Sequence, residues 1–332
     1  MKRKLRIRVV IMSIVLLGGA ALLLLRTPTR SAGPEPVYKG RPVRDWVSEI
    51  WVADEARNPQ IKEVVAIGAP AVPYLIKRLE DPRPFYARNP VYAKLWQFTP
   101  FWLQKHLPDP RQPNADARDM DQAALLAVLS RMGPLAEPAV PTLIRIVGDK
   151  NAQGPTRVIA MEALRHIGPP ARGAVPALLA RLGDSHLRER RRNLEFYGPK
   201  HFFPADNWDL LQRGHAALAL ACLDPSNTRA MQPIRLLLEA TNTTARAYSA
   251  VALWRMEAGP ENQRRVEAAL QDPALRHMTV SALGQIGKPA AGLAPLLAKM
   301  RDETNPTNMF WGYLDHALKS MDSTSADRAT SK

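Results

Sequence analysis

The sequence predicts an all-α protein built from repeated pairs of helices. Three observations support this prediction. First, one pattern of Gly, Pro and apolar residues recurs along the 332 residues. Second, the chain is 46% hydrophobic but only 6% aromatic, which is typical of many Ala- and Leu-rich helices. Third, its 30 prolines are too many for helix interiors, but they suit helix starts and turns.

The clearest copy of this pattern covers residues 154–185. Apolar residues recur on one face of a first helix as far as Ile167. Gly168 then permits the backbone to turn, and Pro169–Pro170 stops the helix. Pro176 suits the first turn of a second helix, which carries an apolar stripe of leucines. We therefore expect a helix, a tight turn and a second helix here.

The same pattern recurs elsewhere in the chain. The second helices begin with AVPYLI at Ala71, AVPTLI at Ala139, AVPALL at Ala174 and LAPLL at Leu293. An apolar residue followed by Gly precedes each motif, and an acidic residue closes each second helix: Asp81, Asp149, Asp184 and Asp302. Because two helices cannot bury their apolar faces alone, neighbouring pairs must stack.

These motifs resemble those of the HEAT-repeat family, an armadillo-type α-solenoid, from about Arg44 to Met321. The resemblance implies a right-handed α-solenoid of about six HEAT-like helix pairs, assigned to residues 42–321. It does not imply one function, because HEAT arrays serve many unrelated roles. A lead-in from Tyr38, YKGRPVRDWV, is similar to one in secreted or membrane-anchored bacterial members.

The pattern divides the solenoid into six units and two caps. The expected units are residues 44–81, 119–149, 154–185, 209–240, 243–272 and 273–302. Apolar residues between Trp46 and Trp51 are expected to cover the first unit, and a lone helix over residues 309–321 to close the last. The fourth and fifth units lack the Gly and Ala-Val-Pro signature, which leaves their inner boundaries open by several residues. Residues 322–332 are expected to be a disordered tail.

Residues 1–26 are expected to be an N-terminal signal-anchor, a transmembrane segment. Basic residues precede the uncharged stretch 9–25, which at about 1.5 Å per residue reaches the short end of a membrane span. The positive-inside rule keeps the N-terminus cytoplasmic and places the repeats outside the membrane, in the periplasm of a bacterium. Secretion after signal cleavage is the alternative, although Arg30 would occupy the −3 position of the nearest cleavage site, after Ala32. Residues 27–41 are expected to form an extended tether.

Two insertions interrupt the repeats, at residues 82–118 and 185–208. Both follow the acidic end of a second helix, so both should emerge on one edge of the solenoid, where insertions commonly mark a binding face. The first is rich in aromatic residues, and the second combines arginines with aromatic residues. The expected partner-binding residues are Trp96, Phe101 and Trp102 as apolar anchors and Arg190, Arg191 and Arg192 as contacts for anionic groups. The alternative is that both insertions only cover the solenoid edge.

The net charge of +15 is a weak indication of nucleic-acid binding. Residues 1–30 hold seven basic residues and no acidic one, which leaves eight positive charges for the rest of the chain. The seven histidines show no metal-ligand spacing, and the single Cys222 excludes an internal disulfide. No phosphate-binding Gly loop and no Gly-x-Ser-x-Gly motif is present. No cofactor, metal or catalytic residue is therefore expected.

The expected function is that of a non-catalytic, membrane-anchored HEAT-repeat scaffold. Such a scaffold binds protein partners through its concave face and its edge insertions, and neither nucleic acid nor a small-molecule substrate is expected. Two alternatives stay open. The insertion from Arg188 to Trp208 could bind nucleic acid or another polyanion. The repeats could also carry an enzyme similar to the chromophore lyases or alkylpurine DNA glycosylases of the HEAT family.

Overall fold

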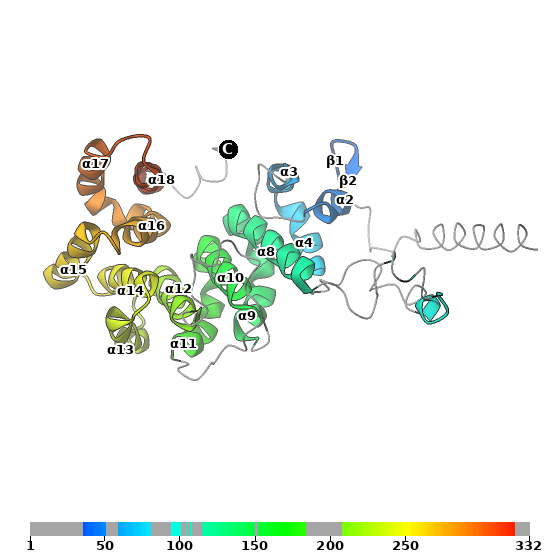
Figure 1. Cartoon of the computed structure of the whole chain (residues 1–332), viewed down its shortest axis with the longest axis horizontal. Helices are drawn as coiled ribbons and strands as arrows, with labels where there is room; N and C mark the ends of the chain where they lie inside the picture. Colours follow the sequence, from blue (N-terminus) through cyan, green and yellow to red (C-terminus); the bar gives the residue numbers. More distant parts are fainter. Residues whose placement is uncertain are drawn as a thin grey trace, which may run out of the picture. The chain divides into compact units, whose positions relative to one another are not determined.

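The computed structural model describes residues 36–50, 59–80, 94–100, 104, 107, 115–149, 152–183 and 208–322. The chain forms two compact units. The first comprises Met1–Val43 and Arg83–Arg118, and the second comprises Arg44–Pro82 and Asp119–Lys332. The described residues are mostly helical and pack helix on helix, which confirms the predicted all-α class (Figure 1). The anchor predicted for residues 9–25 lies outside the described residues.

The first unit contains a short antiparallel hairpin. Its strands are β1 (Val37–Tyr38) and β2 (Arg41–Pro42). Lys39 and Gly40 form the turn with φ angles of 49° and 76°, as two-residue hairpin loops require. Within the tether expected over residues 27–41, the structure describes only this hairpin, whose two-residue strands are too short to show an alternation of apolar and polar residues in the sequence.

The second unit is a succession of helix pairs, which α2 (Val43–Ser48) precedes and α18 (Met309–Asp322) follows. The pairs are α3 (Gln60–Ile67) with α4 (Val72–Glu80), α8 (Ala115–Met132) with α9 (Val140–Gly148), α10 (Gly154–Ile167) with α11 (Val175–Gly183), α12 (Trp208–Leu223) with α13 (Thr228–Leu236), α14 (Thr243–Met256) with α15 (Pro260–Gln271), and α16 (Arg276–Ile286) with α17 (Ala294–Asp302).

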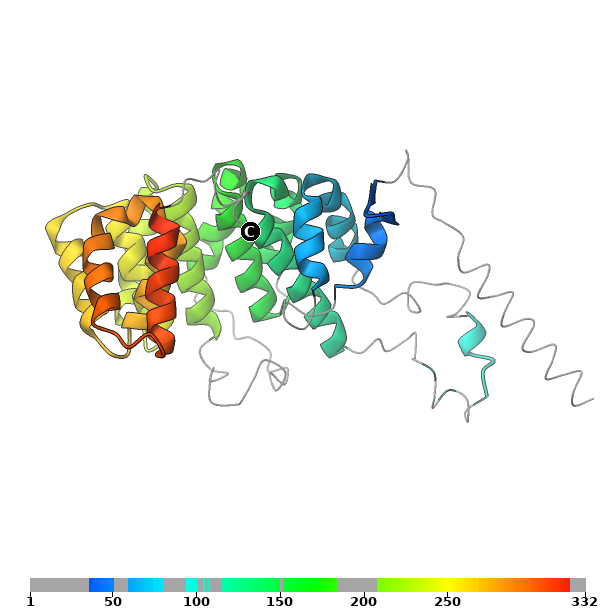
Figure 2. The same ribbon diagram turned by 90° about the horizontal axis from the view of Figure 1, so that it is seen from above.

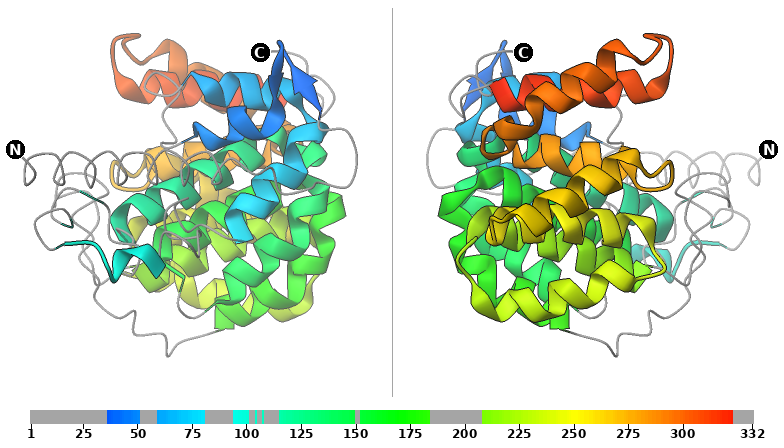
Figure 3. Two further views of the ribbon diagram at one scale, coloured as in Figure 1. Left: turned by 90° about the vertical axis from the view of Figure 1, so that its right-hand side faces the viewer. Right: turned by 90° about the vertical axis from the view of Figure 1, so that its left-hand side faces the viewer.

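Consecutive pairs pack with first helix against first helix. α10 contacts α12, α12 contacts α14, α14 contacts α16 and α16 contacts α18. The second helices follow the same order, because α9 contacts α11 and α11 contacts α13. Figure 1 shows α11, α13, α15 and α17 on the outer side of a curved row of first helices from α10 to α18. Figure 2 shows the same helices from above, and Figure 3 shows them from the two ends. We call the side lined by the first helices α10 to α18 the inner face.

Glycine sets the turn inside four of the pairs. Gly68, Gly133, Gly168 and Gly287 have φ angles of 71°, 54°, 77° and 70°, a region that residues with a side chain rarely adopt. A short 3-10 helix begins at or directly after each glycine. These 3-10 helices are η1 (Ala69–Ala71), η2 (Gly133–Ala139), η3 (Pro169–Ala174) and η7 (Lys288–Leu293). The turn expected from the sequence is thus extended by 3-10 helix before the second helix starts.

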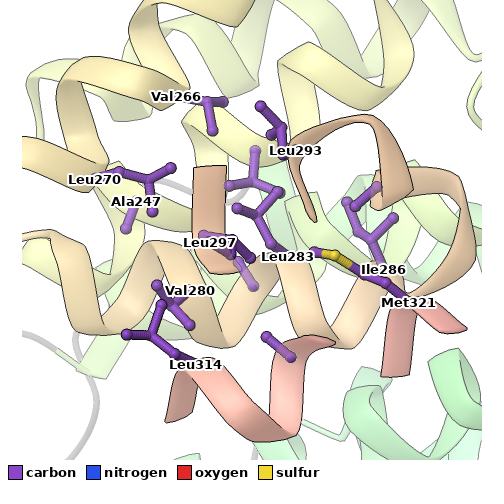
Figure 4. Packing of buried hydrophobic residues seen from close by; sticks show 14 of the residues in the cluster. Ala247, Val266, Leu270, Val280, Leu283, Ile286, Leu293, Leu297, Leu314 and Met321 are labelled. Atoms are coloured by element: carbon purple, nitrogen blue, oxygen red, sulfur yellow. The ribbon is translucent and has the colours of Figure 1, made fainter. Parts of the chain in front are cut away.

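An apolar core joins the last helix pairs to α18. Figure 4 shows its side chains converging from α14 to α18. Leu283 of α16, Leu297 of α17 and Leu314 of α18 have no exposed surface. Each such leucine contributes about 1.5–3 kcal/mol through burial. The lone helix α18 therefore covers the apolar face that the α16–α17 pair would otherwise expose.

Arginine side chains link one helix pair to the next at the helix ends. The carbonyl groups in the last turn of an α-helix have no partner within that helix. Nη2 of Arg181 in α11 donates to the Val147 carbonyl of α9 at 3.1 Å. Nε of Arg213 in α12 donates to the Leu182 carbonyl of α11 at 2.9 Å. A positive group at this end also interacts favourably with the helix dipole.

Arg157 in α10 is the most deeply buried of these arginines that the structure describes, at 3% exposed. It donates to the carbonyl groups of Asp149 and Ala152, which follow α9, and to Oε1 of Gln212 in α12. One side chain thus connects three successive pairs. Part of the positive charge of the chain therefore serves to satisfy backbone carbonyl groups.

Gly214 lets two first helices approach closely. A Cβ atom at this position in α12 would lie 2.8 Å from the Cα atom of Ala245 in α14, which is closer than packed atoms allow. Gly284 and Ala317 repeat the arrangement between α16 and α18, with a distance of 3.0 Å.

One helical stretch in the described part of the chain, Gln122–Gly148, is long and apolar enough to cross a membrane. It combines α8, η2 and α9, and 56% of its apolar window is buried inside the protein. The core helix of a soluble protein has the same length and composition, so this stretch is weak evidence for a membrane span.

Replacing Arg157 with Met is expected to lower the free energy of unfolding by about 2–3 kcal/mol, because buried oxygens lose a charged donor. Urea unfolding followed by circular dichroism measures the change. The matched control is Arg264→Met, since Arg264 is exposed and donates to the Pro260 carbonyl of its own helix. Its effect should stay within about 0.5 kcal/mol. Equal effects of the two substitutions would contradict the role assigned to Arg157.

Replacing Gly214 with Ala is expected to lower the free energy of unfolding by about 1–3 kcal/mol, because the added methyl group pushes α12 away from α14. Gly312→Ala is the control: Gly312 also lies within a helix, but its Cβ would meet no atom within 4 Å. There the higher helix propensity of Ala should raise stability by about 0.5–1 kcal/mol. A gain in stability at both positions would argue against a close approach at Gly214.

Candidate functional site

The inner face carries a polar pocket of about 230 Å³ between three first helices. α10 supplies Glu162, Arg165 and His166, α16 supplies Ser281 and Gln285, and α18 supplies Tyr313 and His316. On each helix the first and last of these residues are three or four positions apart, so the residues share one helix face. A pocket that gathers charged and polar groups from separate helices is a common form of binding site.

Arg165 connects α10 to α16 beside the pocket. Its Nη1 donates a hydrogen bond to Oε1 of Gln285, which follows 120 residues later in the chain. The pairs that begin with α12 and α14 lie between these two helices in the sequence. The bond therefore spans the inner side of the curved row, and the side chain of Arg165 is largely buried there, at 6% exposed.

The amide group of Gln285 is held on its other side as well. Its Nε2 donates to the Tyr248 hydroxyl at 3.0 Å and to Oγ of Ser281 at 3.1 Å. Burial and the nearby charge of Glu162 raise the pKa of Tyr248, so its hydroxyl group stays protonated and accepts this bond. With three partners, the Gln285 side chain has one defined orientation.

Glu162 lies against His215 of α12, with Oε1 and Nδ1 3.5 Å apart. Burial, together with the charge of Arg165, lowers the pKa of His215 to about 3, so its imidazole is neutral at physiological pH. Burial also raises the pKa of Glu162, although Arg165 opposes this shift. The contact therefore joins a carboxyl group to a neutral ring. The Glu162 side chain remains 30% exposed, and it lines the pocket.

Two further histidines complete the pocket wall. Nδ1 of His166 lies 2.6 Å from Oγ of Ser130 in α8, which orients the ring, whereas His316 is exposed on α18. The pocket thus offers guanidinium donors to a carboxylate or phosphate and carboxylate oxygens to an ammonium group. It can contact both signs of charge on one ligand.

Trp96 is not among the residues that line this pocket. Trp96 belongs to the first unit, where it is buried with 3% of its surface exposed. Phe101, Trp102, Arg190, Arg191 and Arg192 lie outside the described residues. Their role in partner binding stays a prediction.

The sequence analysis did not identify the pocket, because its histidines and charged residues show no short motif. A signal is present when repeats are aligned on their turn glycines. Glu162 and Ser281 are each six residues before such a glycine, and His166 and Gln285 are each two residues before it. Polar residues at equivalent positions of two apolar first helices indicate one face that the repeats keep polar.

Within the described ranges, no group of three or more His, Cys, Asp or Glu side chains could hold a metal ion. In comparisons with known proteins, no protein-family model, curated protein or solved structure matches the chain.

The buried His215 is expected to make stability depend on pH. Its folded-state pKa of about 3 is below the unfolded value of about 6.5, so only the unfolded state binds this proton between these values. Stability is therefore lost as pH falls from about 6.5 towards 3, by at most about 1.4 kcal/mol per pH unit. The raised pKa of Glu162 acts in the opposite direction, since its contribution is lost as pH rises through that pKa.

Urea unfolding at several pH values should show this loss for the unmodified protein and a smaller loss for His215→Gln. His277→Gln is the control, because burial lowers the pKa of His277 at a position that is less buried. It should change the pH dependence less than His215→Gln. A stability difference between the unmodified protein and His215→Gln that is constant with pH would rule out a buried neutral imidazole.

Proposed function

We propose that the chain is a membrane-anchored α-solenoid of HEAT-like helix pairs that acts as a non-catalytic scaffold. It binds a protein partner through the inner face, and the insertions at residues 82–118 and 185–208 add to this surface. The repeats lie outside the membrane that residues 9–25 span. The observation that carries the proposal is the polar pocket on the inner face, which Arg165 and Gln285 brace between pairs far apart in the sequence.

Stacked helix pairs support this proposal because they form a preformed surface. Each first helix is held by its neighbours in the row, so the pocket residues keep their positions without a partner. A polar pocket on such a surface gives orientation and specificity, while the apolar contacts between helices supply stability. Binding to a preformed face also requires little ordering on association.

The described arginines favour a protein partner over nucleic acid. Arg157, Arg181 and Arg213 donate to backbone carbonyl groups of neighbouring helix pairs, which leaves fewer guanidinium groups for phosphates. The alternative of a polyanion partner therefore depends on the insertion from Arg188 to Trp208.

A catalytic role is the second candidate, and the environment of Glu162 favours it. A carboxyl group whose pKa is raised by burial, beside an arginine in a pocket, is a frequent feature of acid–base catalysts. Glycosylase-like chemistry would need a catalytic Asp, and none of the residues lining this pocket is Asp. We therefore rank binding above catalysis.

Cross-linked capture from membranes tests the scaffold proposal. The full chain is compared with an inner-face variant, Glu162→Gln with Arg165→Gln, which removes both charges at the pocket. The control is Glu261→Gln with Arg265→Gln, which removes an exposed Glu–Arg ion pair from the second helix α15. We expect the full chain and the control to capture the same partner. The amount captured by the inner-face variant should be at least about 10-fold lower.

Circular dichroism first confirms that each variant is folded. A further variant replaces residues 82–118 and 185–208 with short turns, and reduced capture by this variant assigns part of the surface to the insertions. Equal capture by the full chain and the inner-face variant would refute binding through the inner face.

A further inference from the structure

Glu162 and Arg165 keep their charges apart although they are three residues apart on one helix. Residues at this spacing are neighbours on the helix surface and commonly form an ion pair. No ion pair between them is formed in the described part of the chain. The Arg165 guanidinium instead donates to the neutral amide of Gln285, and the Glu162 carboxyl group lies against the neutral ring of His215.

Both groups line the pocket, and neither contacts a group of opposite charge directly among the described residues. The positive charge of Arg165 also acts on Glu162 through space, and it opposes the rise in the pKa of this carboxyl group. The pocket therefore presents a carboxyl group and a guanidinium group at neighbouring positions.

We infer that this pocket binds a compact zwitterion, a small molecule with an ammonium and a carboxylate group bonded to the same carbon atom, as in a free α-amino acid. The inference deepens the proposed function, on which it rests, by naming the chemistry that the inner face recognises. The ammonium group donates to the Glu162 carboxylate, and the carboxylate accepts from the free N–H groups of Arg165. A cavity of about 230 Å³ suits a ligand of this size.

Ligands with a single charge fit the pocket less well. A carboxylate alone would be attracted by Arg165 but repelled by Glu162. An ammonium group alone would be attracted by Glu162 but repelled by Arg165. In a partly buried pocket such repulsion is stronger than in water, because the effective dielectric constant is lower. A zwitterion satisfies both groups at once, so the arrangement discriminates by charge pattern.

The remaining walls limit the ligand further. Gly284 and Ala317 both line the pocket, and their close backbone contact closes the space between α16 and α18. Tyr313 is 37% exposed at one wall, where its ring can cover an apolar side chain, and Ser281 adds a hydroxyl group. The pocket thus has polar groups for the charged end of an amino acid and a ring for the rest.

Calorimetric titration of the full chain in detergent tests the inference. The probes are the common α-amino acids, each added singly, with propionate and ethylamine as analogues of alanine that keep one charge each. We expect at least one amino acid to bind, and propionate and ethylamine to bind at least about 10-fold more weakly than that amino acid. Glu162→Gln and Arg165→Gln should each weaken binding by a similar factor, whereas Glu261→Gln with Arg265→Gln should not change it.

The inference is overturned if no amino acid binds, if the singly charged analogues bind as well as the amino acid, or if neither pocket substitution weakens binding. Competition with the captured partner identifies the source of the zwitterion. If the amino acid displaces the partner, the partner itself presents this charge pattern. If it binds without displacing the partner, the free amino acid is the ligand. If no amino acid binds but the inner-face variant still loses its partner, the inference fails and the proposed function stands.

Discussion

The carbonyl groups at helix ends impose the constraint on which the helix pairs depend. α9 and α11 have only nine residues each, so the last turn, whose carbonyl groups lack partners, is a large part of each helix. Arg181 and Arg213 satisfy such groups from the following pair, and this requires the next pair to stack in one register. Apolar burial alone would tolerate a sliding or rotated neighbour, because it is non-directional. The arginine bonds add the direction that burial lacks.

The inner face follows from unequal spacing on the two sides of the stack. Gly214 and Gly284 bring first helices nearly to backbone contact, whereas Gly148 and Gly183, at the ends of the second helices α9 and α11, have no atom within 4 Å of an added Cβ. A row whose members approach more closely on one side curves towards that side, which Figure 1 shows for α10 to α18. Curvature brings α10 near α16, so Arg165 can reach Gln285. The pocket is therefore a product of how the pairs pack rather than of any single repeat.

The fold could be predicted from the sequence to the extent that local chemistry determines it. Local sequence determines three of its features: the turn glycines, the prolines at the start of second helices and the helix expected over residues 309–321. The structure has a positive φ at the turn glycines and a helix, α18, over residues 309–322. The pair α14–α15 lacks the Gly turn, and its boundary instead depends on Gly259 and Pro260, which start α15. The pocket could not be derived in this way, because Arg165 and Gln285 belong to different pairs and no spacing rule brings them together. The partner-binding roles of Phe101 and Arg190 stay predictions, since both residues lie outside the described residues.

The arrangement at the pocket has a cost that packing alone does not explain. A direct pair between Glu162 and Arg165 would reduce the penalty for burying their charges. Instead, Arg165 binds a neutral amide and Glu162 lies beside a neutral ring, so burial raises the pKa of the carboxyl group. Structures optimised only for stability avoid such groups, whereas binding and catalytic sites retain them because a ligand supplies the missing partner. The separation of Glu162 and Arg165 on a braced inner face is therefore the main support for the proposed binding role of this pocket.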